Sequence, residues 1–141
     1  MDMLINIDVP DIEAALRFYQ TAVDLKFKRF LFGGTVAEME GASSSLYLTF
    51  KKAGSYPSPE TIQRREYHRH WTPVHLDFIV DDIEKAVSRA CGAGAVLEGE
   101  IACFGWGRLA TMSDPFGNGF CLLQWQGQGY EADAATTAPD A

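Results

Sequence analysis

The chain has 141 residues, of which 47% are apolar and 22% are charged. This length and composition suit one globular domain and exclude a chain that is disordered throughout. The 12 Lys and Arg are outnumbered by 19 Asp and Glu, so no nucleic-acid partner is expected, because phosphate binding needs clustered positive charge. No apolar run approaches the roughly 20 residues that span a bilayer, so no membrane partner is expected.

The cysteine content indicates a reduced protein. Cys91, Cys103 and Cys121 form no CxxC pair, and an odd number without a secretory signal argues against a disulfide framework. The acidic segment after Met1 has no signal-peptide pattern. We therefore expect a cytoplasmic protein.

An internal repeat predicts the architecture. Residues 5–16 read INIDVPDIEAAL, and residues 76–87 read LDFIVDDIEKAV. Five positions are identical, and the apolar positions match in kind at an offset of 71 residues, about half the chain. Such self-similarity indicates two copies of one structural unit.

The first copy predicts a strand, a helix and three further strands. Apolar and polar residues alternate over residues 5–9, which is typical of a strand. Asp11 can cap the helix that follows, because its carboxylate accepts from free backbone N–H groups. Gly33-Gly34 suits a hairpin turn. The three further strands are expected at residues 27–32, 35–40 and 45–50.

The second copy has the same pattern. Asp82 can cap its helix, and Gly92 and Gly94 are expected to end it. Residues 114–119 read DPFGNG, which predicts a turn between the last two strands. The three further strands are expected at residues 96–101, 108–113 and 120–126.

Two segments lie outside these copies. Residues 54–72, rich in Pro, Arg, Tyr and His, are predicted to be a linker or a flap. The basic residues from Arg64 to Arg69 are interpreted as a solvated loop. Residues 127–141 are predicted to be a disordered tail, because they carry little apolar content.

The chain resembles the vicinal oxygen chelate superfamily of glyoxalase I, bleomycin-resistance proteins, fosfomycin-resistance enzymes and extradiol dioxygenases. The resemblance covers about residues 3–126 and depends on the paired Val-x-Asp-Ile-Glu segments, Arg17-Phe18-Tyr19 and the DPFGN segment at residues 114–118. It implies an α+β fold in which residues 1–126 are one domain. Two βαβββ modules, residues 3–53 and 73–126, then form a curled, cup-shaped mixed sheet with the ligand in the cup.

The resemblance also implies where a metal would bind. Enzymes of the superfamily hold a divalent metal with His, Gln or Glu from the first and last strand of each module. These positions correspond to Leu4, Tyr47, His75 and Cys121. His75 is the only family-type ligand, so we expect no complete metal site and no cofactor.

Strand alternation indicates which side chains line the cup. Several also have a plainer interpretation: a hydrogen-bonded structural residue for His75, solvated strand residues or loop caps for Asp8 and Asp77, an inert buried thiol for Cys121, packing for the two tryptophans, and a surface ion pair for Arg108. The candidate ligand-binding residues are Asn6, Asp8, Tyr47, Thr49, His75, Asp77, Cys121, Leu123 and Trp125 on strands, with Trp106 and Arg108 from the glycine-flanked segment 104–108.

The leading hypothesis is a glyoxalase/bleomycin-resistance-like protein that binds a small organic molecule in the cup. The alternative is a metal-dependent lyase, isomerase, thiol transferase or dioxygenase, in which Asp77, Asp8 or Cys121 replaces the missing ligands, or Glu38 or Glu40 does so in a different strand register. Whether the chain is an enzyme stays open, and so does an interaction module without a small ligand. We expect a homodimer, in which the cup forms within one chain or between two.

Overall fold

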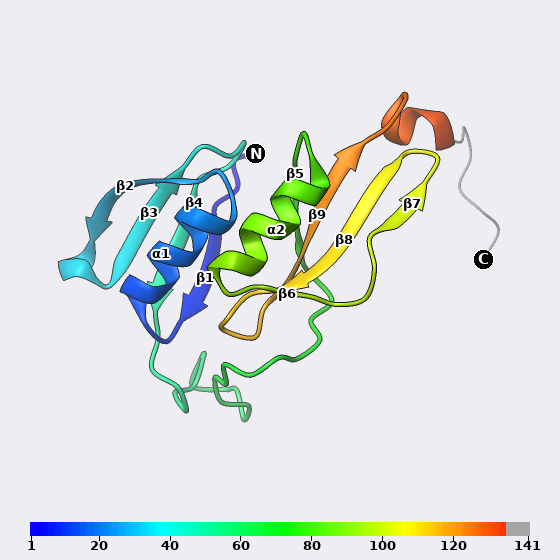
Figure 1. The fold of residues 1–141 in the computed structure, drawn as a ribbon. Helices are drawn as coiled ribbons and strands as arrows, with labels where there is room; N and C mark the ends of the chain where they lie inside the picture. The colour runs from blue at the N-terminus through cyan, green and yellow to red at the C-terminus, as the bar shows by residue number, and fades with distance from the viewer. Residues whose placement is uncertain (135–141) are drawn as a thin grey trace.

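The computed structural model describes residues 1–134, which form a β-α-β-β-β module followed by a similar module with one additional short strand (Figure 1). Module 1 has a four-stranded sheet in the order β1-β4-β3-β2, in which β1 and β4 are parallel and the other pairs are antiparallel. Its elements are β1 (Ile5–Val9), α1 (Ile12–Ala22), β2 (Lys26–Leu31), the 3-10 turn η1 (Phe32–Gly34), β3 (Val36–Glu40) and β4 (Leu46–Phe50).

Module 2 repeats this topology. Its sheet has the order β5-β9-β8-β6, with β5 and β9 parallel, and β7 pairs with β8. Its elements are β5 (Leu76–Ile79), α2 (Ile83–Ala93), β6 (Val96–Leu97), β7 (Ala102–Phe104), β8 (Gly107–Ser113) and β9 (Gly119–Trp125), and the 3-10 helix η2 (Gly129–Asp133) follows.

The sequence repeat and the structural repeat coincide. The Asp11 carboxylate accepts from the Ala14 backbone N–H at 3.0 Å, and Asp82 accepts from that of Lys85 at 3.1 Å. Both aspartates therefore cap helix starts, as predicted. The second helix ends at Gly94, whose φ of 117° lies in the left-handed region that favours glycine.

The two modules share one hydrophobic core. In Figure 1, α1 lies against the first sheet, and α2 lies between α1 and the second sheet. The apolar faces of both sheets pack on these helices: Leu48 and Leu122 are fully buried in the same cluster as Phe18 of α1 and Ala90 of α2. The face of each sheet away from its helix is the helix-free face, which carries most of the candidate ligand-binding side chains.

Two predicted segments differ in the structure. The strand expected at residues 96–101 is only two residues long, and a further strand, β7, follows it, because Gly99 has a positive φ of 92° that interrupts the extended chain. The tail expected from residue 127 begins with η2, whose Tyr130 ring packs against Trp125 at a centroid distance of 4.6 Å. The rest of that prediction, residues 135–141, lies outside the described residues.

The linker, residues 54–72, contains no helix or strand and is fastened to both modules (Figure 1). The Arg65 guanidinium pairs with Asp8 of β1 at 2.7 Å, and Arg69 pairs with Glu98 at 2.7 Å. The interpretation of this basic segment as a solvated loop holds for the exposed Arg64 and Arg69 but not for Arg65, whose side chain is only 14% exposed.

Candidate functional site

The helix-free face of module 1 carries a row of polar side chains across three strands. Asn6, Tyr47 and Glu38 are register partners on β1, β4 and β3. Thr49 lies one position further along β4, and its hydroxyl donates to the Asn6 side-chain oxygen at 3.2 Å. The structure thus brings three predicted residues together: Asn6, Tyr47 and Thr49.

Glu38 is the most buried charged group of this row, with 5% exposure. Its carboxylate accepts from Arg29 Nε at 2.5 Å and from the Tyr47 hydroxyl at 3.3 Å, and Lys28 lies 3.8 Å away. The hydrogen bond from Arg29 holds the Glu38 pKa below its usual value. The sequence analysis considered Glu38 only as a metal ligand in a different strand register. Its alternation with the apolar Ala37 and Met39 was the signal that could have placed it on this face.

The helix-free face of module 2 joins three candidate metal ligands. His75 Nδ1 lies 2.8 Å from Asp77 Oδ1, and Asp77 is the register partner of Cys121 on β9. One ligand atom from each of these residues lies within 4.8 Å of the others. The three side chains were predicted to line the site, and they form one cluster.

Cys121 in this cluster is a poor nucleophile. Its residue is 7% exposed. Burial raises the pKa of the thiol, and the neighbouring Asp77 carboxylate raises it further. A reactive thiol needs a nearby cation that stabilises the thiolate. The pairing of Cys121 with a carboxylate therefore favours the protonated form.

The linker adds a charged pair beside this cluster. Both carboxylate oxygens of Glu98 accept from Arg69, at 2.7 and 2.9 Å, and this hydrogen bonding lowers the Glu98 pKa. The Arg69 guanidinium lies directly on β9, since a Cβ on Gly119 would come within 2.9 Å of it. Sequence reasoning missed both residues, because nothing in the local pattern links positions 29 residues apart.

The predicted tryptophans lie at the far end of module 2. Trp106 stacks on Phe104 at 4.8 Å, and it also packs against Trp125 and Tyr130. Trp125 keeps 41% exposure, whereas the predicted Leu123 is 1% exposed. The tryptophans therefore pack against other aromatic rings, which is their plainer interpretation, and Trp125 also keeps an exposed surface.

Arg108 lies on the opposite face of the sheet. Its guanidinium donates to Glu84 of α2. Gln124, its register partner, accepts from the Ile83 backbone N–H at the start of the same helix. This differs from the expectation that Arg108 lines the ligand site. The sequence signal that could have shown this is strand alternation, because Arg108 shares its face of β8 with the buried Ala110 and Met112.

Some of the candidate polar residues of the two modules line a shared crevice, and others do not. Asn6, Asp8 and His75 line one crevice of about 540 Å³, which the linker also lines. Asp8 is engaged there by Arg65. A second hollow, of about 510 Å³, lies on module 1 alone and includes Tyr47 and Thr49. The predicted residues therefore occupy two neighbouring regions and not one enclosed cup within residues 1–134.

Two of the three sequence motifs of the resemblance, Arg17-Phe18-Tyr19 and the DPFGN segment, have a structural role. Tyr19 of α1 donates to the Asp114 carboxylate at 2.5 Å, and both residues are buried. Asp114 also accepts from Phe116 N, Asn118 N and Asn118 Nδ2. Burial and the neighbouring carboxylate raise the Tyr19 pKa well above 10.0. This hydrogen bond connects the first helix to the DPFGN turn and therefore joins the modules.

The cluster of module 2 does not match the donors that a hard divalent metal prefers. Hard cations favour oxygen and imidazole ligands over sulfur. Here one of three donors is a thiol with a raised pKa, and the module 1 position that corresponds to His75 is Leu4, which is 65% exposed. One imidazole, one carboxylate and one thiolate would suit zinc better, because zinc binds nitrogen, oxygen and sulfur.

The paired βαβββ modules and their helix-free faces define a protein of the vicinal oxygen chelate superfamily. The sequence model of the glyoxalase-like domain matches residues 4–123, so the chain belongs to the glyoxalase-like domain family. No curated protein matches the chain. No helix within residues 1–134 has the length and apolar character needed to cross a membrane.

Solved structures share the fold at low sequence identity. The fosfomycin resistance protein FosX from Listeria monocytogenes has a TM-score of 0.70 and 15% identity, over 94% of this chain and 96% of that one. A glyoxalase/bleomycin resistance protein/dioxygenase family enzyme from Burkholderia phytofirmans PsJN has a TM-score of 0.69 and 20% identity, over 89% and 100%. A mutant of the Listeria protein was crystallised with Mn(II) and 1S,2S-dihydroxypropylphosphonic acid, and it matches at 15% identity and a TM-score of 0.65, with 87% of each chain covered.

Proposed function

We propose that the protein binds a small organic molecule against the helix-free faces of its modules and needs no complete metal site to do so. The observation that carries this proposal is the mutual pairing of the polar groups on these faces. Glu38 is held by Arg29 and Tyr47, and His75 is held by Asp77. Such preorganised polar groups beside open apolar surface fix the orientation of a ligand.

The candidate ligand-binding residues would make two kinds of contact with a ligand. Asn6, Tyr47, Thr49, His75 and Asp77 offer hydrogen bonds, and Trp106 and Trp125 offer aromatic contact. Leu123 offers no contact, because it is 1% exposed. We assign no ligand contact to Arg108, because its charge is paired with Glu84 on the other face. We expect the ligand to be a small molecule with a flat apolar part and a few polar groups.

The alternative function is a metal-dependent reaction, and the cluster of His75, Asp77 and Cys121 favours it. These residues would hold a zinc ion and leave a coordination position open, which is the arrangement of catalytic zinc sites. When bound, the ion would polarise oxygen atoms of a substrate.

Metal analysis of protein purified without chelator or affinity tag distinguishes the two functions. We expect less than one equivalent of metal, and equal amounts in wild type, His75→Ala and the matched control His68→Ala. Stoichiometric zinc that is lost in His75→Ala but kept in His68→Ala would overturn the metal-free function.

Thermal shift with bleomycin, fosfomycin and catechol then tests binding, and Asn6→Ala and Tyr47→Phe should reduce any shift.

We further propose that the protein is a homodimer in the cytoplasm. The edge strands β1 and β5 each pair on one side only, and the helix-free faces of one chain remain open. A second copy would cover these faces and bring the polar row of one module opposite that of another. Light scattering at micromolar concentration tests this, and a monodisperse monomer would contradict it.

A further inference from the structure

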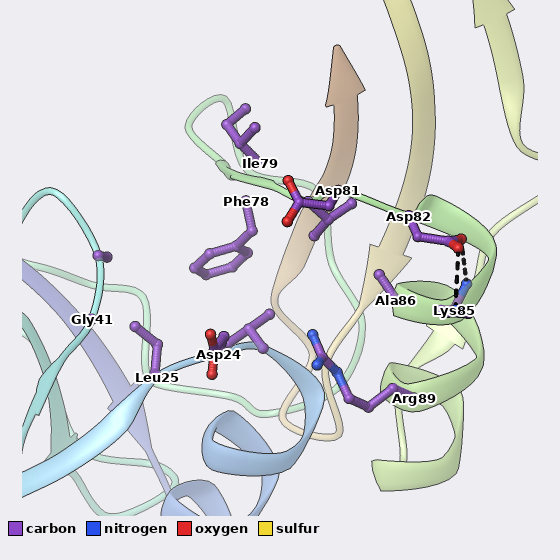
Figure 2. Close-up of a pocket in the computed structure, with 13 residues that line it drawn as sticks. Asp24, Leu25, Gly41, Phe78, Ile79, Asp81, Asp82, Lys85, Ala86 and Arg89 are labelled. Atoms are coloured by element: carbon purple, nitrogen blue, oxygen red, sulfur yellow. Dashed lines mark hydrogen bonds and ion pairs between the residues drawn. The ribbon is translucent and has the colours of Figure 1, made fainter. Parts of the chain in front are cut away.

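A third crevice lies between the modules, away from the helix-free faces. It has a volume of about 450 Å³, and Figure 2 shows it bounded by the end of α1 on one side and by β5 and α2 on the other. Its apolar surface includes Leu25 and the half-buried Phe78. Gly41 fixes one wall, because a Cβ there would come within 2.8 Å of the Asp24 carbonyl oxygen.

Three charged side chains point into this crevice without a protein partner. In Figure 2 the Asp24 carboxylate lies below the Phe78 ring, the Asp81 carboxylate lies above it, and the Arg89 guanidinium approaches from α2. None of the three makes a side-chain hydrogen bond or ion pair within residues 1–134. The other two charges pair with each other, since Lys85 Nζ lies 3.9 Å from Asp82 Oδ2.

The spacing of these groups does not suit a single metal ion. Within the described part of the chain, three or more potential ligand atoms converge only at His75, Asp77 and Cys121. The aspartates of the crevice therefore belong to no group of three converging ligands. Their separation across an apolar surface suits an organic molecule that carries its charges at intervals.

We propose that this crevice binds a basic amino acid, a small molecule with two ammonium or guanidinium groups and one carboxylate. The unpaired protein charges are two carboxylates and one guanidinium, and a complementary ligand carries the opposite set. The ligand carboxylate pairs with Arg89, its two cationic groups pair with Asp24 and Asp81, and its aliphatic chain lies along Phe78. This site is independent of the ligand proposed for the helix-free faces.

Isothermal titration calorimetry with three probes tests the proposal on the full chain. L-lysine carries all three charges, cadaverine lacks the carboxylate, and norleucine lacks the side-chain ammonium. Each missing exposed charge pair should weaken binding by up to about fivefold. We therefore expect L-lysine to bind more tightly than either analogue.

Variants assign each charge to its partner. Arg89→Gln should weaken lysine binding and leave cadaverine unchanged, whereas Asp24→Asn and Asp81→Asn should weaken both. Arg17→Gln, an exposed arginine on α1 outside the crevice, is the matched control and should change neither. His75→Ala should also leave lysine binding intact, which separates this site from the one proposed above.

Two results would overturn the proposal. One is equal affinity of wild type for lysine, cadaverine and norleucine, including no measurable binding of any of them. The other is an Arg89→Gln variant that binds lysine as Arg17→Gln does. All the substituted side chains are exposed, so circular dichroism should show that every variant remains folded.

Discussion

Replacing Tyr19 with Phe should loosen the connection between the modules. The Tyr19 hydroxyl donates to Asp114 Oδ2 at 2.5 Å, and the two residues are 2% and 5% exposed. A hydrogen bond to a charged group contributes about 1.5–3 kcal/mol to stability. Asp114 keeps three other donors in the variant, so its charge stays partly compensated, and we expect a loss of about 2 kcal/mol.

Urea denaturation of Tyr19→Phe measures this loss. The midpoint should fall while the slope stays constant, because the surface exposed on unfolding is unchanged. Tyr67→Phe is the matched control, since the Tyr67 hydroxyl donates to the neutral backbone carbonyl of Lys51 at 2.7 Å from a half-exposed position. Its loss should stay near 1 kcal/mol or below. Equal losses in the two variants would refute the role of the buried carboxylate.

The same hydrogen bond predicts a dependence on alkaline pH. The Tyr19 pKa in the folded protein is raised well above 10.0 by burial and by Asp114. A group whose pKa is raised on folding stabilises the protein below its unfolded pKa and loses that contribution as pH rises further. The difference in unfolding free energy between wild type and Tyr19→Phe should therefore be constant below about pH 9 and shrink above about pH 10. A constant difference throughout would contradict the assignment.

Two further predictions concern the packing of the linker and the exposure of the cysteine thiols. Gly117 has a φ of 91°, and an added Cβ would lie 2.2 Å from a linker carbonyl oxygen. Gly117→Ala should therefore destabilise the protein by more than about 1 kcal/mol and increase proteolysis of residues 54–72. Gly54→Ala, with a φ of 81° and open space around it, is the control for the backbone effect alone, and limited proteolysis compares the two. Thiol labelling at pH 8 should give two fast phases from the exposed Cys91 and Cys103 and one slow phase from the buried Cys121. Three equal labelling rates would contradict the burial of Cys121.

The sequence alone determined the modular plan of this protein. The repeat at residues 5–16 and 76–87, the two capping aspartates and the strand alternation are local signals, since each depends on neighbours within a few residues. They correctly predicted both helices and the apolar sheet faces. The same alternation would have assigned Glu38 and Arg108 to their faces, had it been followed along β3 and β8.

Only the tertiary structure decided how the modules and the linker come together. The pairs Tyr19–Asp114, Arg65–Asp8 and Arg69–Glu98 join residues that are 95, 57 and 29 positions apart. No local propensity encodes such pairs, because they form only after both sheets have packed on the shared helices. The crevice between Asp24, Asp81 and Arg89 arises in the same way, from charges that became neighbours when the two halves of the chain closed on one core.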